Sequence, residues 1–228
     1  MAIAREDAGS VRNTSTVTSQ IVVPWDGGAP TDGWYMLAFG ASREQRTASI
    51  TDWGDPIAEV QSLTQGWIAL FAKVASSEGS SVTIDLSGNS RKAGIVIAYS
   101  DVDGTDPLGE ILTGEGDSDS FAFTGLTIEN DGATAVAFSG GSNGIDPTTV
   151  VWDNSFSGIK AEGAAGATNG AWAIAGDKAS QSTGDITGGA TQDAETSHFA
   201  HYIATSLNPS GGAPAANILP MVNARMYA

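Results

Sequence analysis

The chain is organised around residues 66–107, GWIALFAKVASSEGSSVTIDLSGNSRKAGIVIAYSDVDGTDP. This stretch contains apolar runs of strand length at 67–74, 82–86 and 93–99, separated by turns rich in Ser, Gly and Asn. Each run is rich in β-branched and aromatic residues, which favour strands. The stretch therefore predicts three consecutive β-strands, and it contains no catalytic motif.

The composition of the whole chain agrees with this interpretation. Of its 228 residues, 41% are hydrophobic, which is normal for a folded protein, and 29 are glycine, which is many for this length. Runs of Leu, Glu, Lys and Arg that favour helices are nearly absent. Short strands joined by tight turns are typical of an all-β sandwich or barrel.

The rest of the chain offers further strands of the same kind. An edge strand is predicted at 11–23 because Pro24 closes it. One helical turn is expected at 107–112. The other predicted strands are 34–39, 50–53, 121–128, 133–138, 149–152, 158–161, 171–176 and 198–206.

These strands predict one sandwich at 11–206, preceded by an N-terminal arm at 1–10 and followed by a C-terminal tail at 207–228. An internal echo indicates related halves at 11–107 and 120–206. The echo aligns 34–42 with 134–142, 50–55 with 150–155, 66–77 with 170–181, and 95–100 with 201–206. Either one sandwich with related halves or two small sandwiches would explain it, and the lack of a clear linker favours one.

The charge of the chain excludes several classes of partner. Acidic residues number 26 and basic residues 10, for a net charge of -16. Nucleic-acid binding and adhesion to anionic membranes both need a basic face, so neither is expected. There is no cysteine, and the N-terminal residues lack the hydrophobic core of a secretion signal. We therefore expect synthesis in a cytoplasm without export by the usual route.

Asp101, Asp103 and Asp106 form the weak metal candidate of the sequence. They lie within DVDGTD, beside a glycine that permits a sharp turn, and Ca²⁺ prefers several oxygen ligands on such a loop. The spacing is not that of an EF-hand, and Asp and Gly are also ordinary turn residues. A plain turn is therefore favoured, and no cofactor is predicted.

Two patterns that could indicate catalysis are weak. Residues 140–144 match G-x-S-x-G around Ser142, but Pro147 and a new strand leave no room for the helix that a nucleophile elbow requires. His198 and His201 lie on a predicted strand, where their rings point to opposite faces. We expect no enzymatic activity.

Tryptophan is the remaining candidate for ligand binding, because carbohydrate-binding sandwiches use exposed aromatic rings. Trp67 and Trp172 lie within apolar runs and are expected in the core. Trp25, Trp34 and Trp53 border loops and are the candidates for an exposed platform.

Four segments resemble a domain of tailed-bacteriophage structural proteins, of the minor tail and head-decoration type. They are DGWYMLAFGAS, ITDWGD, GWIALFAKVASSEGSSVTIDLSG and AGIVIAYSDVDGTDPLGE. The residues that match the family pattern are Lys73, Val74, Ala75, Tyr99, Val102, Asp103 and Pro107. Ser100 and Asp101 replace its usual Arg-Gly. The resemblance covers residues 10–205 and implies a jelly-roll or immunoglobulin-like β-sandwich with a structural role on a virion.

Two functions are therefore carried forward. The first is a non-enzymatic virion protein that decorates or cements the capsid or forms part of the tail, with other virion proteins and further copies of itself as partners. Its sandwich would face solvent, and its ends, including ILPMVNARMY, would dock on neighbouring subunits. The second is a carbohydrate-binding or adhesin module that recognises a host glycan, with or without Ca²⁺.

Overall fold

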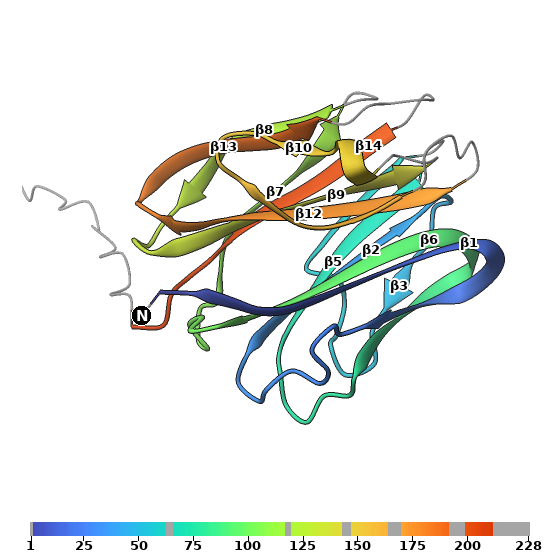
Figure 1. Cartoon of the computed structure of the whole chain (residues 1–228), viewed down its shortest axis with the longest axis horizontal. Helices are drawn as coiled ribbons and strands as arrows, with labels where there is room; N and C mark the ends of the chain where they lie inside the picture. Colours follow the sequence, from blue (N-terminus) through green and yellow to red (C-terminus); the bar gives the residue numbers. More distant parts are fainter. Residues whose placement is uncertain are drawn as a thin grey trace, which may run out of the picture.

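The protein is described by a computed structural model that covers residues 2–62, 66–116, 120–142, 147–163, 170–191 and 199–211. Figure 1 shows antiparallel sheets stacked on one another. The first strands are β1 (Ala4–Pro24), β2 (Tyr35–Ser42), β3 (Ala48–Ser49), β4 (Ala58–Ser62), β5 (Gly66–Val74) and β6 (Ser81–Ser100). The later elements are β7 (Leu108–Gly116), β8 (Ser120–Ile128), β9 (Ala133–Ser142), the 3-10 helix η1 (Pro147–Thr149), β10 (Val151–Trp152), β11 (Ser157–Glu162), β12 (Ala171–Gln181), β13 (Gly184–Thr191) and β14 (Phe199–Leu207).

Nested strand pairing determines the shape of the first half. β1 pairs with β6, and β2 pairs with β5, so the outgoing and returning legs of the chain run side by side. β6 also pairs with β2, and this pairing joins the two strand pairs into one sheet. The order of strands in that sheet is β1-β6-β2-β5-β4. Pairing of the first strand with the last, followed by rolling, is the winding of a jelly roll. The all-β sandwich class predicted from the sequence is thus confirmed.

The second half repeats this winding strand by strand. Its large sheet has the order β7-β14-β9-β12-β11, which matches β1-β6-β2-β5-β4 position by position. Its small sheet, β10-β13-β8, matches the outer layer in which β3 and β1 flank the first part of β6. The long strands β1 and β6 therefore correspond to the pairs β7–β8 and β13–β14. The two halves of the chain thus share one strand order.

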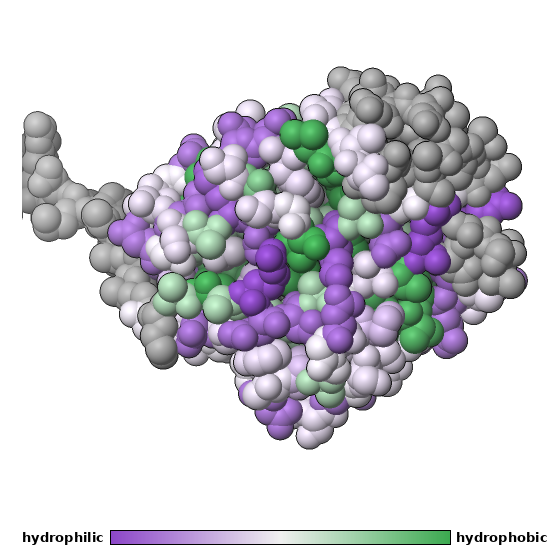
Figure 2. Space-filling model, viewed as in Figure 1, coloured by the Kyte–Doolittle hydropathy of each residue, from purple (hydrophilic) through white to green (hydrophobic). Residues whose placement is uncertain are grey.

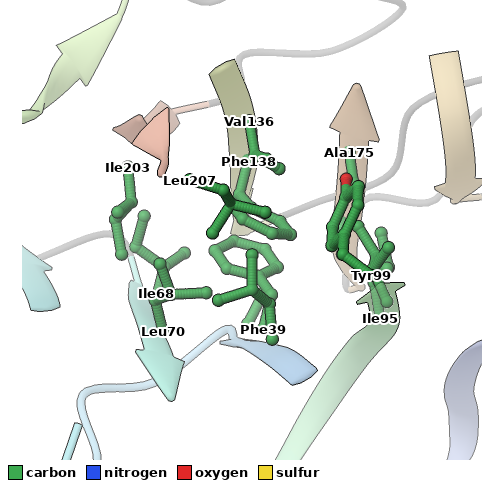
Figure 3. Packing of buried hydrophobic residues seen from close by; sticks show 14 of the residues in the cluster. Phe39, Ile68, Leu70, Ile95, Tyr99, Val136, Phe138, Ala175, Ile203 and Leu207 are labelled. Carbon is green, nitrogen blue, oxygen red and sulfur yellow. The ribbon is translucent and has the colours of Figure 1, made fainter. Parts of the chain in front are cut away.

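The two large sheets pack face to face around a central core, shown in Figure 3. Phe39 of β2 and Phe138 of β9 stack at its centre, with ring centroids 5.2 Å apart. Both residues occupy the same place in their own sheets. Their partners on the neighbouring strands are Leu70 and Ile95 in the first half and Ala175 and Ile203 in the second. The halves are thus related by an approximate two-fold axis near this ring pair.

Two further cores lie on the outer faces of the large sheets. One packs Trp67 under the outer layer of the first half, and the other packs Trp172 under β8 and β13. The molecule is therefore a four-layer stack, in which the central strands β2 and β9 are buried on both faces. Burial on both faces explains why their sequences are continuously apolar, whereas β8, which covers one core only, alternates.

Several sequence-based boundaries differ from the structure. The runs at 82–86 and 93–99 are one strand, β6, because β1 pairs along its whole length and bulges opposite Ser90 and Lys92. The helical turn expected at 107–112 is strand β7. Residues 50–53 form a turn, closed by an Ile50–Gly54 bridge, rather than a strand. Strands β4 and β13 were not predicted.

The N-terminal arm, the C-terminal tail and the single sandwich expected from the sequence also differ from the structure. From Ala4 onward the supposed arm is part of edge strand β1, paired with the end of β6. Residues 208–211 are held against the β6–β7 connection, where Asn208 N–H donates to Pro107 O and Ser210 N–H donates to Asp101 O. Most of the predicted tail, 212–228, lies outside the described residues. The halves form two sandwiches joined by a shared core, rather than one sandwich.

Candidate functional site

A surface groove of about 490 Å³ opens beside β10 and β11 in the second half. Val151 stands 61% exposed at its margin. On the face of the molecule seen in Figure 2, hydrophobic residues form a few separate patches, one of them where Figure 1 places β10. The main lining side chains are Val150, Val151, Trp152, Phe156, Ile159 and Lys160.

An aromatic cluster fixes the indole of Trp152 in this groove. The ring stacks on Phe156 at 6.1 Å and meets the edge of Phe121 at 5.8 Å. Gly176 lies against the ring so closely that a Cβ there would come within 2.7 Å of it. Such contacts leave the half-buried indole little freedom to change rotamer. The groove therefore offers a fixed aromatic wall at Trp152, beside the polar Lys160.

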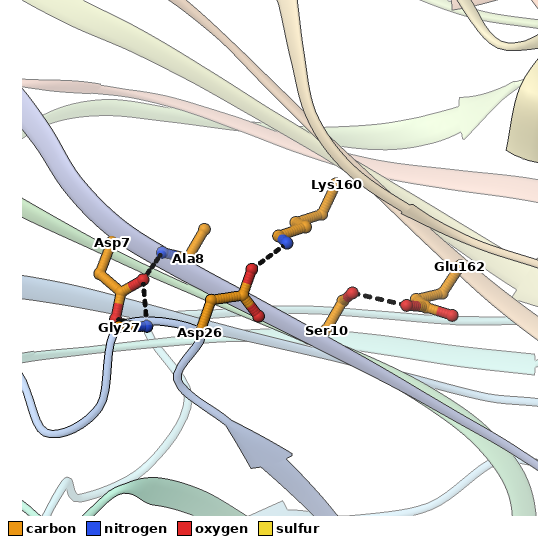
Figure 4. A network of polar contacts seen from close by, with 7 residues as sticks. All are labelled: Asp7, Ala8, Ser10, Asp26, Gly27, Lys160 and Glu162. Carbon is orange, nitrogen blue, oxygen red and sulfur yellow. Dashed lines mark hydrogen bonds and ion pairs between the residues drawn. The ribbon is translucent and has the colours of Figure 1, made fainter.

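A polar seam runs along one side of the groove and joins the two halves (Figure 4). The Lys160 ammonium forms an ion pair with Asp26, and the Ser10 hydroxyl donates to Glu162 at 2.5 Å. Arg12 donates to the carbonyl of Gly163 at 2.7 Å. Burial lowers the pKa of Arg12, and the nearby Glu162 opposes this effect. These contacts hold β11 of the second half against β1 of the first.

A second polar contact between the halves involves the buried Tyr99. Arg5 forms an ion pair with Asp177 at 3.2 Å, and the Tyr99 hydroxyl donates to the same carboxylate at 3.1 Å. Burial raises the pKa of Asp177, and the charge of Arg5 opposes this increase. Burial also raises the pKa of Tyr99 well above its ordinary value. We interpret this cluster as structural, since it lies within the packing of the two sheets.

The acidic loop after β6 does not assemble a metal site in the structure. Asp103 accepts hydrogen bonds from the backbone N–H groups of Thr105 and Asp106, so its carboxylate caps a turn. Asp101 takes a positive φ of 58° and binds Ser210 through its own carbonyl. Within the described residues, no three His, Asp or Glu side chains gather as a metal-binding group. Asp103 therefore serves as a turn residue in the described structure.

Ser142 and His201, the described polar residues of the weak catalytic patterns, are buried in strands. Ser142 ends β9 and pairs with Ala171 and Phe199 on its two neighbours, so it does not sit on a nucleophile elbow. His201 of β14 is 1% exposed, while His198 lies outside the described residues. Burial lowers the pKa of His201, and Glu115, 4.0 Å from Nδ1, opposes this effect. Neither pattern forms a reactive site among the residues described.

The tryptophans divide differently from the expectation. Trp67 and Trp172 are buried, which confirms their place in the core. Trp25 is only 4% exposed, so it cannot serve as an exposed platform. Trp34 and Trp53 are half-buried and pack against the outer core of the first half.

Trp152, the tryptophan of the groove, was not singled out from the sequence. The sequence feature that could have drawn attention to Trp152 is the echo between 50–55 and 150–155. It aligns the segment that contains Trp152 with the segment that contains Trp53, one of the loop-bordering tryptophans. That signal gave no indication of exposure, because exposure depends on strands β11 and β12 folding beside β10.

A buried lysine was also missed. Lys92 is 1% exposed, and its ammonium donates to the carbonyl and hydroxyl of Thr18 across the β1 bulge. Burial lowers its pKa. Beside it, the hydroxyls of Ser42 and Ser90 lie 2.7 Å apart, and Ser90 also donates to Glu44. We interpret this network as the support of the bulge, at the point where β1 passes from the inner to the outer layer.

Searches of known protein families, curated proteins and solved structures find no match to this chain. No helix in the described part of the chain is long and apolar enough to cross a membrane.

Proposed function

We propose that this protein is a non-enzymatic structural component of a tailed-bacteriophage virion, where it decorates or cements the capsid or forms part of the tail. The observation that carries the proposal is the pair of jelly rolls fused through their large sheets. Jelly rolls are recurrent building units of viral shells, although lectin domains and cupins also use them. The fold therefore supports the proposal together with the sequence resemblance.

The residues that carry the resemblance have structural roles in this fold. Lys73 at the end of β5 forms an ion pair with Glu78 at 2.7 Å. Tyr99 is buried between the halves, Val102 bridges to Pro209, and Asp103 caps its turn. A motif that specifies strand ends and turns is what we expect of a family defined by its architecture. Such a motif supports a structural role and gives no reason to propose catalysis.

The acidic net charge supports the proposal that the partners of this chain are other proteins. With a net charge of -16, the chain is not expected to bind nucleic acid or an anionic membrane. We propose other virion proteins and further copies of this chain as its partners. Its place of action would be the particle, after synthesis in the host cytoplasm.

Deletion of residues 212–228 tests the proposal. The cut begins after Gly211 because residues 208–211 are bonded to the 101–107 connection and belong to the folded body. We expect the truncated protein to keep its thermal unfolding midpoint and to lose incorporation into particles. A matched control replaces the segment with a Gly/Ser sequence of the same length. Normal incorporation of the truncated protein would contradict the proposed role of this end.

A glycan-binding module remains the alternative function, and the groove at Trp152 is the observation that favours it. Its volume lies within the range of small-molecule sites, which is about 300–1,000 Å³. In this case, glycan-array binding should be lost in Trp152→Ala and retained in Trp25→Ala, because Trp25 is buried. Loss of binding on chelation would show a Ca²⁺ requirement. An array without any bound glycan would remove this alternative.

A further inference from the structure

We propose that the groove between β10 and β11 receives the C-terminal segment, residues 212–228, of a neighbouring copy of this chain. This inference rests on the proposed function, since it names the contact by which copies would join in a virion. It assigns a partner to the apolar surface around Val151 and Trp152.

The groove has the features of a site for an extended segment. β11 is the last strand of its sheet, and among the described residues it pairs with β12 alone, so its other edge carries no strand in this part of the structure. β10 likewise ends the small sheet. Addition of a strand to such an edge supplies backbone hydrogen bonds, while adjacent pockets accept alternate side chains. Here the lining combines apolar side chains, among them the exposed Val151 and the indole of Trp152, with the polar Lys160.

The C-terminal segment has the complementary chemistry. It contains no Asp or Glu, one basic residue, Arg225, and the apolar sequence ILPMV followed by Met226 and Tyr227. The Asp26 carboxylate already pairs with Lys160 of the groove, but its side chain is 58% exposed, so a second positive charge can approach it. Pro220 is compatible with an added edge strand, where one N–H can remain unpaired.

A neighbouring copy, rather than the same copy, is favoured by charge. Each chain carries a net charge of -16, so copies repel one another and assembly needs a contact that offsets this repulsion. A segment that is apolar and without acidic residues meets this need if it bridges two copies. Fully extended, a segment of this length reaches on the order of 50 Å, so its tip can lie far from Gly211.

Photo-crosslinking of the full-length protein tests the contact. Tyr227 is replaced by p-benzoyl-L-phenylalanine, and equal amounts of ¹⁴N- and ¹⁵N-labelled chains are mixed before irradiation at high protein concentration. We expect mixed-isotope crosslinks from position 227 to residues 150–161. Val151→Asp should lower their yield roughly tenfold, because a charge replaces a buried valine contact. Val22→Asp, at a 48% exposed valine of β1, serves as the matched control and should leave the yield unchanged.

Each other outcome counts against the inference. Crosslinks within a single chain, crosslinks elsewhere on the surface, or no crosslinks would overturn it. A glycan that binds the groove in a Trp152-dependent manner, with crosslinks unaffected by Val151→Asp, would assign the groove to sugar instead. Loss of particle incorporation on deletion of 212–228, without crosslinks to the groove, would retain the virion role and reject this docking site.

Discussion

Replacing Phe138 with alanine tests whether the two jelly rolls unfold as one unit. The ring lies at the centre of the core between the halves, is 0% exposed, and stacks on Phe39 of the other half at 5.2 Å. Its removal leaves a cavity that neighbours cannot easily fill, because β9 is held by backbone pairing to β12 and β14. The substitution therefore acts on the shared core rather than on either half alone.

The expected loss follows from this burial. A buried Phe→Ala substitution costs about 3–5 kcal/mol, which includes the lost transfer free energy and the cavity. Phe39→Ala should cost a similar amount, since Phe39 has the equivalent position and is also 0% exposed. The direct interaction of the two rings contributes about 0.5–1.5 kcal/mol of this. The double variant should therefore lose less than the sum of the single variants.

Urea unfolding measures the free energy of unfolding of the wild type, the two single variants and the double variant. The transition is followed by tryptophan fluorescence and by far-UV circular dichroism. Trp67 reports on the first half and Trp172 on the second, because each lies in its own outer core. We expect one coincident transition in the wild type, displaced to lower urea in each variant. Two separate transitions in the wild type, or a loss below about 1 kcal/mol in Phe138→Ala, would refute the shared core as a source of cooperativity.

Two further predictions concern buried strand positions. Since burial holds the pKa of His201 below its ordinary value near 6.5, the unfolded chain binds this proton first, so stability should fall as pH drops below about 6.5. His201→Leu should flatten this part of the stability–pH curve measured by urea unfolding, and an unchanged slope would contradict the assignment. Gly140→Ala places a Cβ 2.8 Å from the Cβ of Ala41 in the other half and should cost about 1–3 kcal/mol in thermal unfolding. The cost should be partly recovered by adding Ala41→Gly, and the absence of any recovery would show that this contact is not its cause.

The strands that the sequence predicted best are those in the middle of the large sheets. Residues 34–39 and 133–138 are continuously apolar because each strand faces a core on both sides, and both strands are present. The strands that were missed, β4 and β13, face solvent along part of their length and contain Gly, Ser, Gln and Asp. Their strand conformation depends on pairing with β5 and β8, which a local pattern does not reveal.

The internal repeat also shows that a local sequence pattern does not reveal how strands pair. The echo recovered the order of the strands and matched the strand of Trp67 with the strand of Trp172, whose tryptophans both face outward. It aligned 34–42 with 134–142 one residue out of register, whereas the pairing makes Phe39 equivalent to Phe138. A shift by one residue exchanges the two faces of a strand. In a strand that is apolar on both faces, the sequence contains little information to prevent this error.

The sequence by itself determined the all-β class, the acidic charge, the buried places of Trp67 and Trp172, and the recurrence of related strands. Each of these follows from composition or from side-chain periodicity along a short segment. Only the tertiary structure decided that the halves stack as two jelly rolls, that residues 208–211 bond to the β6–β7 connection, and that Trp152 lines a groove. These features depend on which strands pair and on which faces meet, and such contacts join residues far apart in the chain that local patterns cannot relate.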